Sequence, residues 1–269
     1  MRRVVLASVL LLSSLPACAG VPSSKPGVFE VRQDKAILNG HVLNLTLVKP
    51  ATPRQPQLMI LLASGDAGWM GAAGDVFEHL AESGHPIAAV DSREVVKYVK
   101  RSGGLMAIPD AAAAVDSVLV QARKLLGLPE TTPVIVSGYS RGANLVVFTA
   151  AVPQLQHHLT GALAVALTRE TDYLEAPADV PPGSVDDRGR IQTYPAIARA
   201  GSIPFAVIQS TGDKYVTAEE ARRLFGSDTP TRRLYEVDAR NHGFSGGRDE
   251  LMRDLDDALA WIESAAQLQ

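Results

Sequence analysis

The chain has 269 residues, a formal net charge of −3 and 46% hydrophobic residues. This length can bury a large core in one domain or two, and the hydrophobic content is ordinary for a globular protein. Because the charge is close to balance, the sequence lacks the basic footprint of a nucleic-acid binder, and we expect no nucleic-acid partner.

The first residues have the pattern of a secretory signal peptide. Arg2 and Arg3 precede an apolar run over residues 4–15, which is too short to span a bilayer permanently. Small residues follow the run. The pattern predicts a signal peptide over residues 1–19 and export to the periplasm or cell envelope of a Gram-negative bacterium.

The only cysteine of the chain lies inside this segment. Cys18 follows Leu15-Pro16-Ala17, which resembles the bacterial lipobox and predicts cleavage before Cys18 and a lipid anchor on it. The competing interpretation is ordinary cleavage after Ala19, in an A-x-A pattern. In both cases the mature body has no cysteine to pair, so its stability cannot depend on an internal disulfide.

Residues 20–27 are rich in Pro, Ser and Gly, which predicts a tether, and residues 28–269 then form one domain. Strand patterns follow at residues 29–31, 35–38, 41–48, 57–63, 87–90, 134–136, 161–167, 203–209 and 233–237. Asn39-Gly40 marks a hairpin turn between the early strands. Helical patterns cover residues 77–83, 109–126, 143–151, 217–225 and 249–266.

Strands alternate with helices through the middle and end of the chain. This order predicts an α/β fold with a mostly parallel sheet, helices on both faces and an antiparallel N-terminal hairpin. Residues 168–202 hold several prolines and glycines and no long periodic segment, so we expect a loop or partial lid there.

Residues 132–143 contain the most informative motif. A short apolar, β-branched strand runs into Gly138-Tyr139-Ser140-Arg141-Gly142, and a helical segment follows at once. This is the G-x-S-x-G pattern in the strand–turn–helix context of a nucleophile elbow. Side chains at positions 138 and 142 would collide with the neighbouring strand and helix, which explains the two glycines.

Residues able to complete a catalytic site follow other predicted strands. Asp213 follows the strand at 203–209 and His242 follows the last strand, so the chain order is Ser, Asp, His, the order typical of α/β-hydrolases. An imidazole can take the proton of Ser140, and a carboxylate can orient the imidazole. Asp238 and Asp91 are the rivals of Asp213 for the carboxylate role.

An oxyanion hole needs two backbone N–H donors. We expect one from Arg141, directly after the nucleophile, and one from Asp66 or Ala67 in the loop after an early strand. Gly65 and Gly68 would let that loop approach the site closely.

With these residues identified, the chain from about residue 57 onward resembles the α/β-hydrolases. More narrowly, it resembles the bacterial virulence-protein family of VirJ and the AcvB C-terminal domain. The matching pieces are Ser64-Gly65-Asp66-Ala67-Gly68-Trp69, Asp91-Ser92 and Gly138-Tyr139-Ser140-Arg141-Gly142-Ala143. The chain departs from the family in having Arg141 in place of an aromatic residue and Asn144 in place of an acid. The resemblance implies a periplasmic protein and, for AcvB-like members, hydrolysis of an aminoacyl ester of phosphatidylglycerol.

The sequence therefore predicts an exported serine hydrolase that cleaves an ester with Ser140, His242 and Asp213. Its partner would be a small-molecule or lipid ester, and a lipid on Cys18 would associate it with a membrane. No H-E-x-x-H spacing is present, so we expect neither a metal nor a cofactor. The alternative is a non-catalytic, VirJ-like binding or assembly factor on the same fold.

Overall fold

The computed structural model describes residues 20–55, 58–100, 104–175 and 184–267. The predicted signal peptide, including Cys18, lies outside these ranges. Within them, no helix combines the length and the apolar character needed to cross a membrane.

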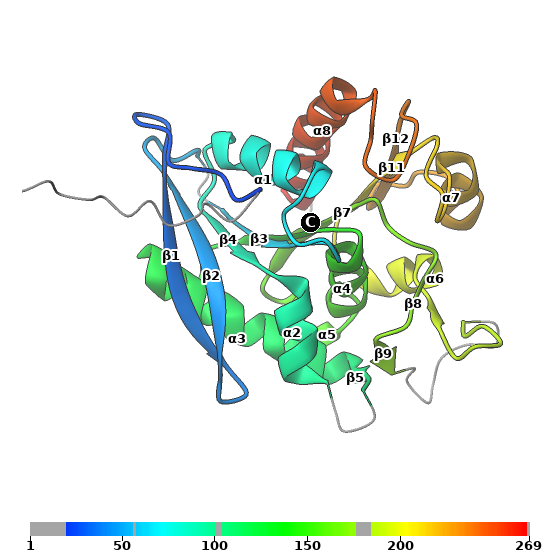
Figure 1. Cartoon of the computed structure of the whole chain (residues 1–269), viewed down its shortest axis with the longest axis horizontal. Helices are drawn as coiled ribbons and strands as arrows, with labels where there is room; N and C mark the ends of the chain where they lie inside the picture. The colour runs from blue at the N-terminus through cyan, green and yellow to red at the C-terminus, as the bar shows by residue number, and fades with distance from the viewer. Residues whose placement is uncertain (1–19, 56–57, 101–103, 176–183, 268–269) are drawn as a thin grey trace, which may run out of the picture.

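A large, mostly parallel sheet forms the centre of the molecule (Figure 1). Its eight strands are β1 (Phe29–Leu38), β2 (His41–Pro50), β3 (Met59–Ala63), β4 (Ile87–Val90), β6 (Val134–Tyr139), β7 (Leu159–Val165), β11 (Phe205–Ser210) and β12 (Arg232–Val237). They lie in the order β1-β2-β4-β3-β6-β7-β11-β12. From β4 to β12 all neighbours are parallel, whereas β1 and β2 form an antiparallel hairpin. Asn39 and Gly40 turn this hairpin with φ of 51° and 78°. The predicted fold class is confirmed.

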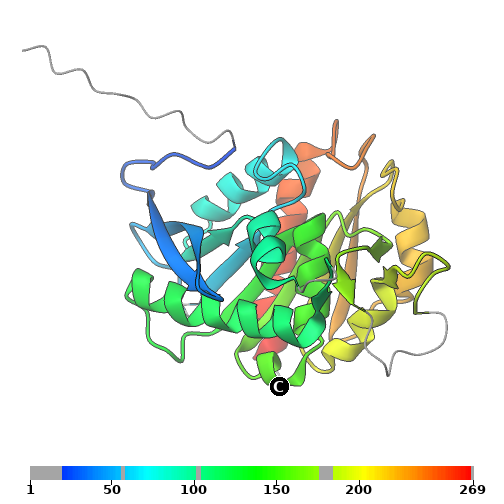
Figure 2. The same ribbon diagram turned by 60° about the horizontal axis from the view of Figure 1, so that its bottom comes forward.

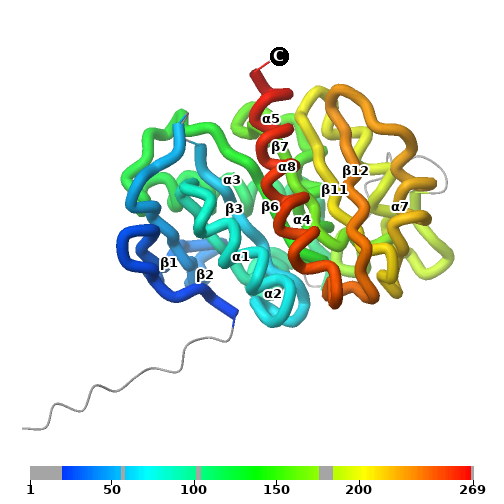
Figure 3. Tube along the Cα trace, turned by 90° about the horizontal axis from the view of Figure 1, so that it is seen from above, coloured from blue at the N-terminus to red at the C-terminus, as the bar shows by residue number. Residues whose placement is uncertain are grey.

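Helices cover both faces of the sheet (Figure 3). The apolar cluster on one face includes side chains of α1 (Ala72–Glu82) and α8 (Arg248–Ala266). The cluster on the other face includes side chains of α2 (Ser92–Val99), α3 (Ile108–Leu126), α4 (Arg141–Ala150), α5 (Pro153–Gln156), α6 (Tyr194–Ile197) and α7 (Ala218–Phe225). Strands such as β3 are buried along their whole length because both faces are covered.

Residues 168–202 hold more structure than the expected loop. The strands β8 (Glu170–Thr171) and β10 (Ile191–Gln192) pair with each other, and β9 (Leu174–Glu175) pairs with β5 (Met106–Ala107). The helix α6 and the short 3₁₀ helix η1 (Ala198–Ala200) follow. Each piece is too short to give a periodic pattern in the sequence. Residues 176–183 lie outside the described ranges.

The segment predicted as a tether lies against the domain. Val21 packs on the apolar cluster of α1 and α8, and the Oγ of Ser24 accepts a hydrogen bond from the N–H of Val31 at 2.7 Å. Lys25 forms an ion pair with Glu82 at 2.7 Å. The segment therefore runs along the surface of the body, as the dark-blue ribbon of Figure 2 shows.

Side chains also occupy backbone groups of one further residue on β1 and of one residue on β12, the two edge strands. On β1, the amide of Gln121 accepts from the N–H of Ile37 at 2.8 Å and donates to its carbonyl at 3.0 Å. On β12, Asp228 accepts from the N–H of Leu234 at 3.1 Å, and Arg222 donates to its carbonyl at 2.8 Å.

Candidate active site

The nucleophile elbow predicted from the sequence is present. Ser140 lies between β6 and α4 with φ 52° and ψ −111°, a strained combination for a residue with a side chain. A Cβ at Gly138 would overlap the backbone of Gly142, and a Cβ at Gly142 would overlap the carbonyl of Ala63 on β3. The two glycines therefore allow the close backbone approach that the turn needs.

The structure brings the three predicted residues together. The Nε2 of His242 lies 2.9 Å from the Oγ of Ser140, and its Nδ1 lies 2.6 Å from Oδ2 of Asp213. The three residues follow β6, β11 and β12, whose carboxyl ends meet at one edge of the sheet. The His242 side chain is 18% exposed, so it can be reached from solvent while its carboxylate partner is buried.

Asp213 is held by two further donors. Its Oδ2 accepts from Nε2 of Gln209 at 3.0 Å, and its Oδ1 accepts from the N–H of Tyr215 at 2.9 Å. The carboxylate has no exposed surface, and these hydrogen bonds give both of its oxygens a donor at that buried position. A hydrogen bond to each oxygen therefore fixes the orientation of the Asp213 carboxylate toward His242.

The rival carboxylates lie elsewhere. Asp91 caps the first turn of α2 and pairs with Arg93, whose hydrogen bonds to it lower its pKa although burial acts in the opposite direction. Asp238 accepts a hydrogen bond from the hydroxyl of Thr211 at 3.3 Å. Of the three candidates, Asp213 alone is paired with His242 among the described residues.

Two aromatic residues that the sequence analysis did not single out contact His242. The hydroxyl of Tyr139 donates to the backbone carbonyl of His242 at 2.5 Å, and burial raises the pKa of this hydroxyl, which keeps it protonated. The ring of Tyr215 meets the imidazole edge to face, with 4.8 Å between ring centroids. Tyr139 occupies a variable position of the elbow pattern, so the motif carried no signal for it.

The expected oxyanion donors flank Ser140. Arg141 is the first residue of α4, so the helix itself offers no acceptor for its N–H. Gly65 begins a turn closed by the hydrogen bond from the N–H of Gly68 to its carbonyl at 3.0 Å, and this turn exposes Asp66 and Ala67. A Cβ at Gly65 would lie 3.5 Å from the Cβ of Ser140, so the turn adjoins the nucleophile.

A polar cleft of about 210 Å³ opens beside Ser140. Its charged lining residues are Asp66, Arg141, Arg169, Glu170, Asp172 and Arg190. Each arginine has a carboxylate partner: Arg141 pairs with Asp66, Arg169 with Glu220, and Arg190 with both Glu170 and Asp186. Asp172 is exposed and forms no ion pair with any residue that the structure describes.

No cluster of His, Cys, Asp and Glu among the described residues could hold a metal ion.

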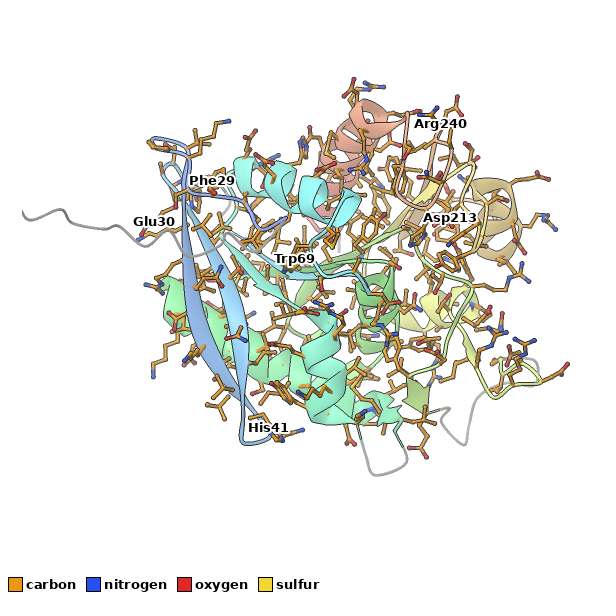
Figure 4. All side chains as sticks on the ribbon, in the orientation of Figure 1. Phe29, Glu30, His41, Trp69, Asp213 and Arg240 are labelled. Carbon is orange, nitrogen blue, oxygen red and sulfur yellow. The ribbon has the colours of Figure 1, made fainter. Side chains whose placement is uncertain are left out.

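Figure 4 labels Trp69, at the end of the turn that adjoins Ser140, and Asp213. Both lie well away from His41 at the tip of the β1–β2 hairpin.

Three solved structures with the same fold are each distant from this chain in sequence. Est1E from Butyrivibrio proteoclasticus has a TM-score of 0.60 at 15% identity, covering 86% of this chain and 99% of that one. An arylesterase has a TM-score of 0.59 at 17% identity, covering 91% and 88%. A putative dienelactone hydrolase from Klebsiella pneumoniae subsp. pneumoniae MGH 78578 has a TM-score of 0.57 at 14% identity, covering 86% and 98%. These likenesses establish the α/β-hydrolase fold.

A search of curated proteins found no match to this chain. The family described as "Bacterial virulence protein (VirJ)" matches residues 57–214, a range that contains Ser140 and Asp213 and ends before His242. Because this match spans more than half of the sequence, the chain belongs to the VirJ family and has an α/β-hydrolase fold.

Proposed function

We propose that this protein is a serine hydrolase that cleaves an ester with Ser140, His242 and Asp213. The observation that carries the proposal is the continuous hydrogen-bonded chain from the Ser140 hydroxyl through both nitrogens of His242 to the buried carboxylate of Asp213. This is the geometry in which a serine becomes a nucleophile.

In the proposed reaction, the Oγ of Ser140 attacks the ester carbonyl while Nε2 of His242 takes its proton. Asp213 stabilises the imidazolium, and the N–H of Arg141 with that of Asp66 or Ala67 stabilises the oxyanion. The intermediate collapses to an acyl-enzyme, and His242 gives its proton to the leaving alcohol. Water then attacks the acyl-enzyme in the same way and releases the acid.

The alternative proposal is a binding or assembly factor that keeps the fold without catalysis. The VirJ family membership supports that alternative, whereas the three connected residues support catalysis, because a binder gains nothing from the full hydrogen-bonded chain. A fluorophosphonate probe distinguishes the two. An activated Ser140 is expected to react with the probe, and Ser140→Ala is expected to remain unlabelled. Absence of labelling in the folded wild-type protein would favour the binding factor.

The cleft supports a substrate with a polar, cationic acyl group. Each of its arginines pairs with a carboxylate, and two of these carboxylates, Glu220 and Asp186, lie outside the cleft lining. Asp172, whose charge also acts on Arg190, is the carboxylate of the lining that has no ion pair among the described residues. A cationic group such as the amine of an aminoacyl ester would meet a complementary potential there. We therefore propose an aminoacyl ester as the substrate class, with an aminoacyl ester of phosphatidylglycerol as the form implied by the family resemblance.

We also propose that the protein is exported to the periplasm or cell envelope and is anchored by a lipid on Cys18. The signal-peptide pattern and the lipobox resemblance support this placement. Fractionation of cells tests it. Wild-type protein is expected with the membranes, and Cys18→Ser is expected either in the soluble periplasm or unprocessed. A mature N-terminus at Gly20 without lipid, measured by mass spectrometry, would contradict the anchor.

A further inference from the structure

The described chain begins in contact with the turn that adjoins the nucleophile. A Cβ at Gly20 would overlap the carbonyl oxygen of Trp69, and a Cβ at Gly74 would lie 2.9 Å from the carbonyl oxygen of Gly20. Val21 packs on the apolar cluster beneath, and Pro22 is buried. Gly20 is therefore seated between the end of the turn and the start of α1.

This contact places Gly20, the first described residue, beside the site. Residues 64–69 run from the end of β3 past Ser140 to Trp69, so one short turn separates Gly20 from the nucleophile. In Figures 2 and 3 the dark-blue start of the described chain lies at the end of the molecule opposite the C-terminus. The carboxyl ends of the parallel strands lie at this same end, because α8 begins there, shortly after β12, and runs to the C-terminus.

Large apolar side chains are exposed on two sides of the site at this end. Met70, directly after Trp69, is 63% exposed, and Tyr215, which contacts His242, is 51% exposed. The ammonium of Lys214 lies 4.8 Å from the Tyr215 ring centroid. Exposed apolar and aromatic side chains with an adjacent cation have the composition of a surface that meets lipid headgroups.

From these observations we infer that the mouth of the site faces a phospholipid bilayer, and that the ester is taken from this bilayer. The inference rests on the proposed function and the proposed anchor. Cys18 lies outside the described residues, so the inference uses only its position in the sequence. Cys18 precedes Gly20 by two residues, and two residues of chain span at most about 7 Å. A lipid on Cys18 would therefore hold the turn at residues 64–69, with Met70, next to the membrane.

A fluorophore near the site can test this orientation. Cys18 is the only cysteine of the chain, so a cysteine introduced into the lipidated protein is the only free thiol available for labelling. Met70→Cys places the probe on the proposed membrane face. Thr131→Cys is the matched control, because this exposed residue precedes β6 and lies at the amino ends of the parallel strands. The labelled proteins are bound to vesicles of phosphatidylethanolamine and phosphatidylglycerol that contain a spin-labelled lipid as quencher.

We expect loss of fluorescence at residue 70 and none at residue 131. Equal quenching at both positions, quenching at residue 131 alone, or failure of the full-length processed protein to bind vesicles would overturn the inference. Hydrolysis of a water-soluble ester by the same samples reports separately on the proposed function. If fluorescence is quenched at residue 70 but the ester is not hydrolysed, the orientation stands and the proposed function is wrong. If the ester is hydrolysed but residue 70 is not quenched, the proposed function stands and the orientation is wrong.

Two glycines of the same segment provide a second comparison. Gly20→Ala is expected to displace the segment from Trp69 and to reduce the difference in quenching between residues 70 and 131. Gly27→Ala is the matched control, because Gly27 also has a positive φ but a Cβ there meets nothing within 4 Å. An unchanged quenching difference in Gly20→Ala would show that the seated segment does not set the orientation.

Discussion

The guanidinium of Arg141 pairs with the carboxylate of Asp66, so an ion pair joins the helix behind the nucleophile to the turn in front of it. Arg141 also lies over the ring of Tyr173, with 4.7 Å from its guanidinium carbon to the ring centroid. Both paired residues are candidates for the backbone donors of the oxyanion hole. The pair therefore connects the two sides of the space in which the oxyanion would form.

Breaking this pair is expected to have a small effect on turnover. The Asp66 side chain is 65% exposed, and an exposed pair contributes at most about 1 kcal/mol, or roughly fivefold in rate. We expect Asp66→Asn to lower kcat by no more than about that factor, with less effect at high salt. Asp34→Asn is the control, because Asp34 pairs with Arg32 on the edge strand β1, away from the site. If the two variants lose kcat equally, the pair of Arg141 and Asp66 makes no specific contribution to turnover.

Ser140→Ala is expected to abolish ester hydrolysis without unfolding the protein, because it removes only the nucleophilic oxygen. His242→Ala should be nearly as severe, with a loss of about 10⁴- to 10⁶-fold in kcat. Ser137→Ala is a suitable control, because the Ser137 hydroxyl is buried on β6 and has no hydrogen-bond partner among the described residues. Turnover of purified Ser140→Ala at the wild-type rate would contradict the proposed mechanism.

Gln209→Leu is expected to lower kcat through Asp213. The substitution removes one donor to a buried carboxylate, and a hydrogen bond to a charged group contributes about 1.5–3 kcal/mol, which corresponds to roughly 10- to 150-fold. Steady-state kinetics should show the loss in kcat rather than KM, together with an altered acid limb of the pH–rate profile. Gln156→Leu, which removes hydrogen bonds to Ala150 and Arg199 outside the site, should change neither.

The proposed preference for a cationic acyl group can be tested by comparing the hydrolysis of two esters. A lysyl ester should be hydrolysed with a higher kcat/KM than a neutral ester of equal size at low salt, and the difference should shrink as ionic strength rises. Asp172→Asn should reduce the preference without reducing hydrolysis of the neutral ester. Equal kcat/KM for the two esters at low salt would remove the charge argument for an aminoacyl substrate.

A pH-dependent change in stability is expected on α8. Burial, followed by repulsion from Glu250 and Asp257, raises the pKa of Asp254 to about 6. The folded state therefore binds this proton more tightly than the unfolded chain, so the stability it contributes is present at low pH and is lost as pH rises through about 6. Asp254→Asn should raise Tm at pH 7.5 by about 1–3 °C and should leave it unchanged at low pH. Asp249→Asn, in the first turn of the same helix, should give no such gain, because a negative charge is favourable at a helix N-terminus.

Much of the site follows from local patterns in the sequence. Ser140 was identifiable because the strand, the turn and the helix are contiguous, and Asp213 and His242 because each follows a strand that ends at the same edge. Tyr139 was not identifiable, because its contact with His242 joins segments far apart in the chain. Gln209 was not identifiable, because its contact with Asp213, four residues later, depends on the turn after β11 and belongs to no motif. Gly20 resembled part of a flexible linker by composition alone, and its contact with Trp69 is purely tertiary.

The hydrogen bonds at Ile37 and Leu234 bear on self-association. An edge strand with free backbone groups is a template on which another chain can add a strand, and edge-to-edge addition is a common start of aggregation. At Ile37 the amide of Gln121, and at Leu234 the pair of Asp228 and Arg222, occupy both the donor and the acceptor that an incoming strand would use. The sheet therefore carries, at each of its two ends, a side-chain substitute for part of the missing neighbour, which removes one attachment point for an added strand at each edge.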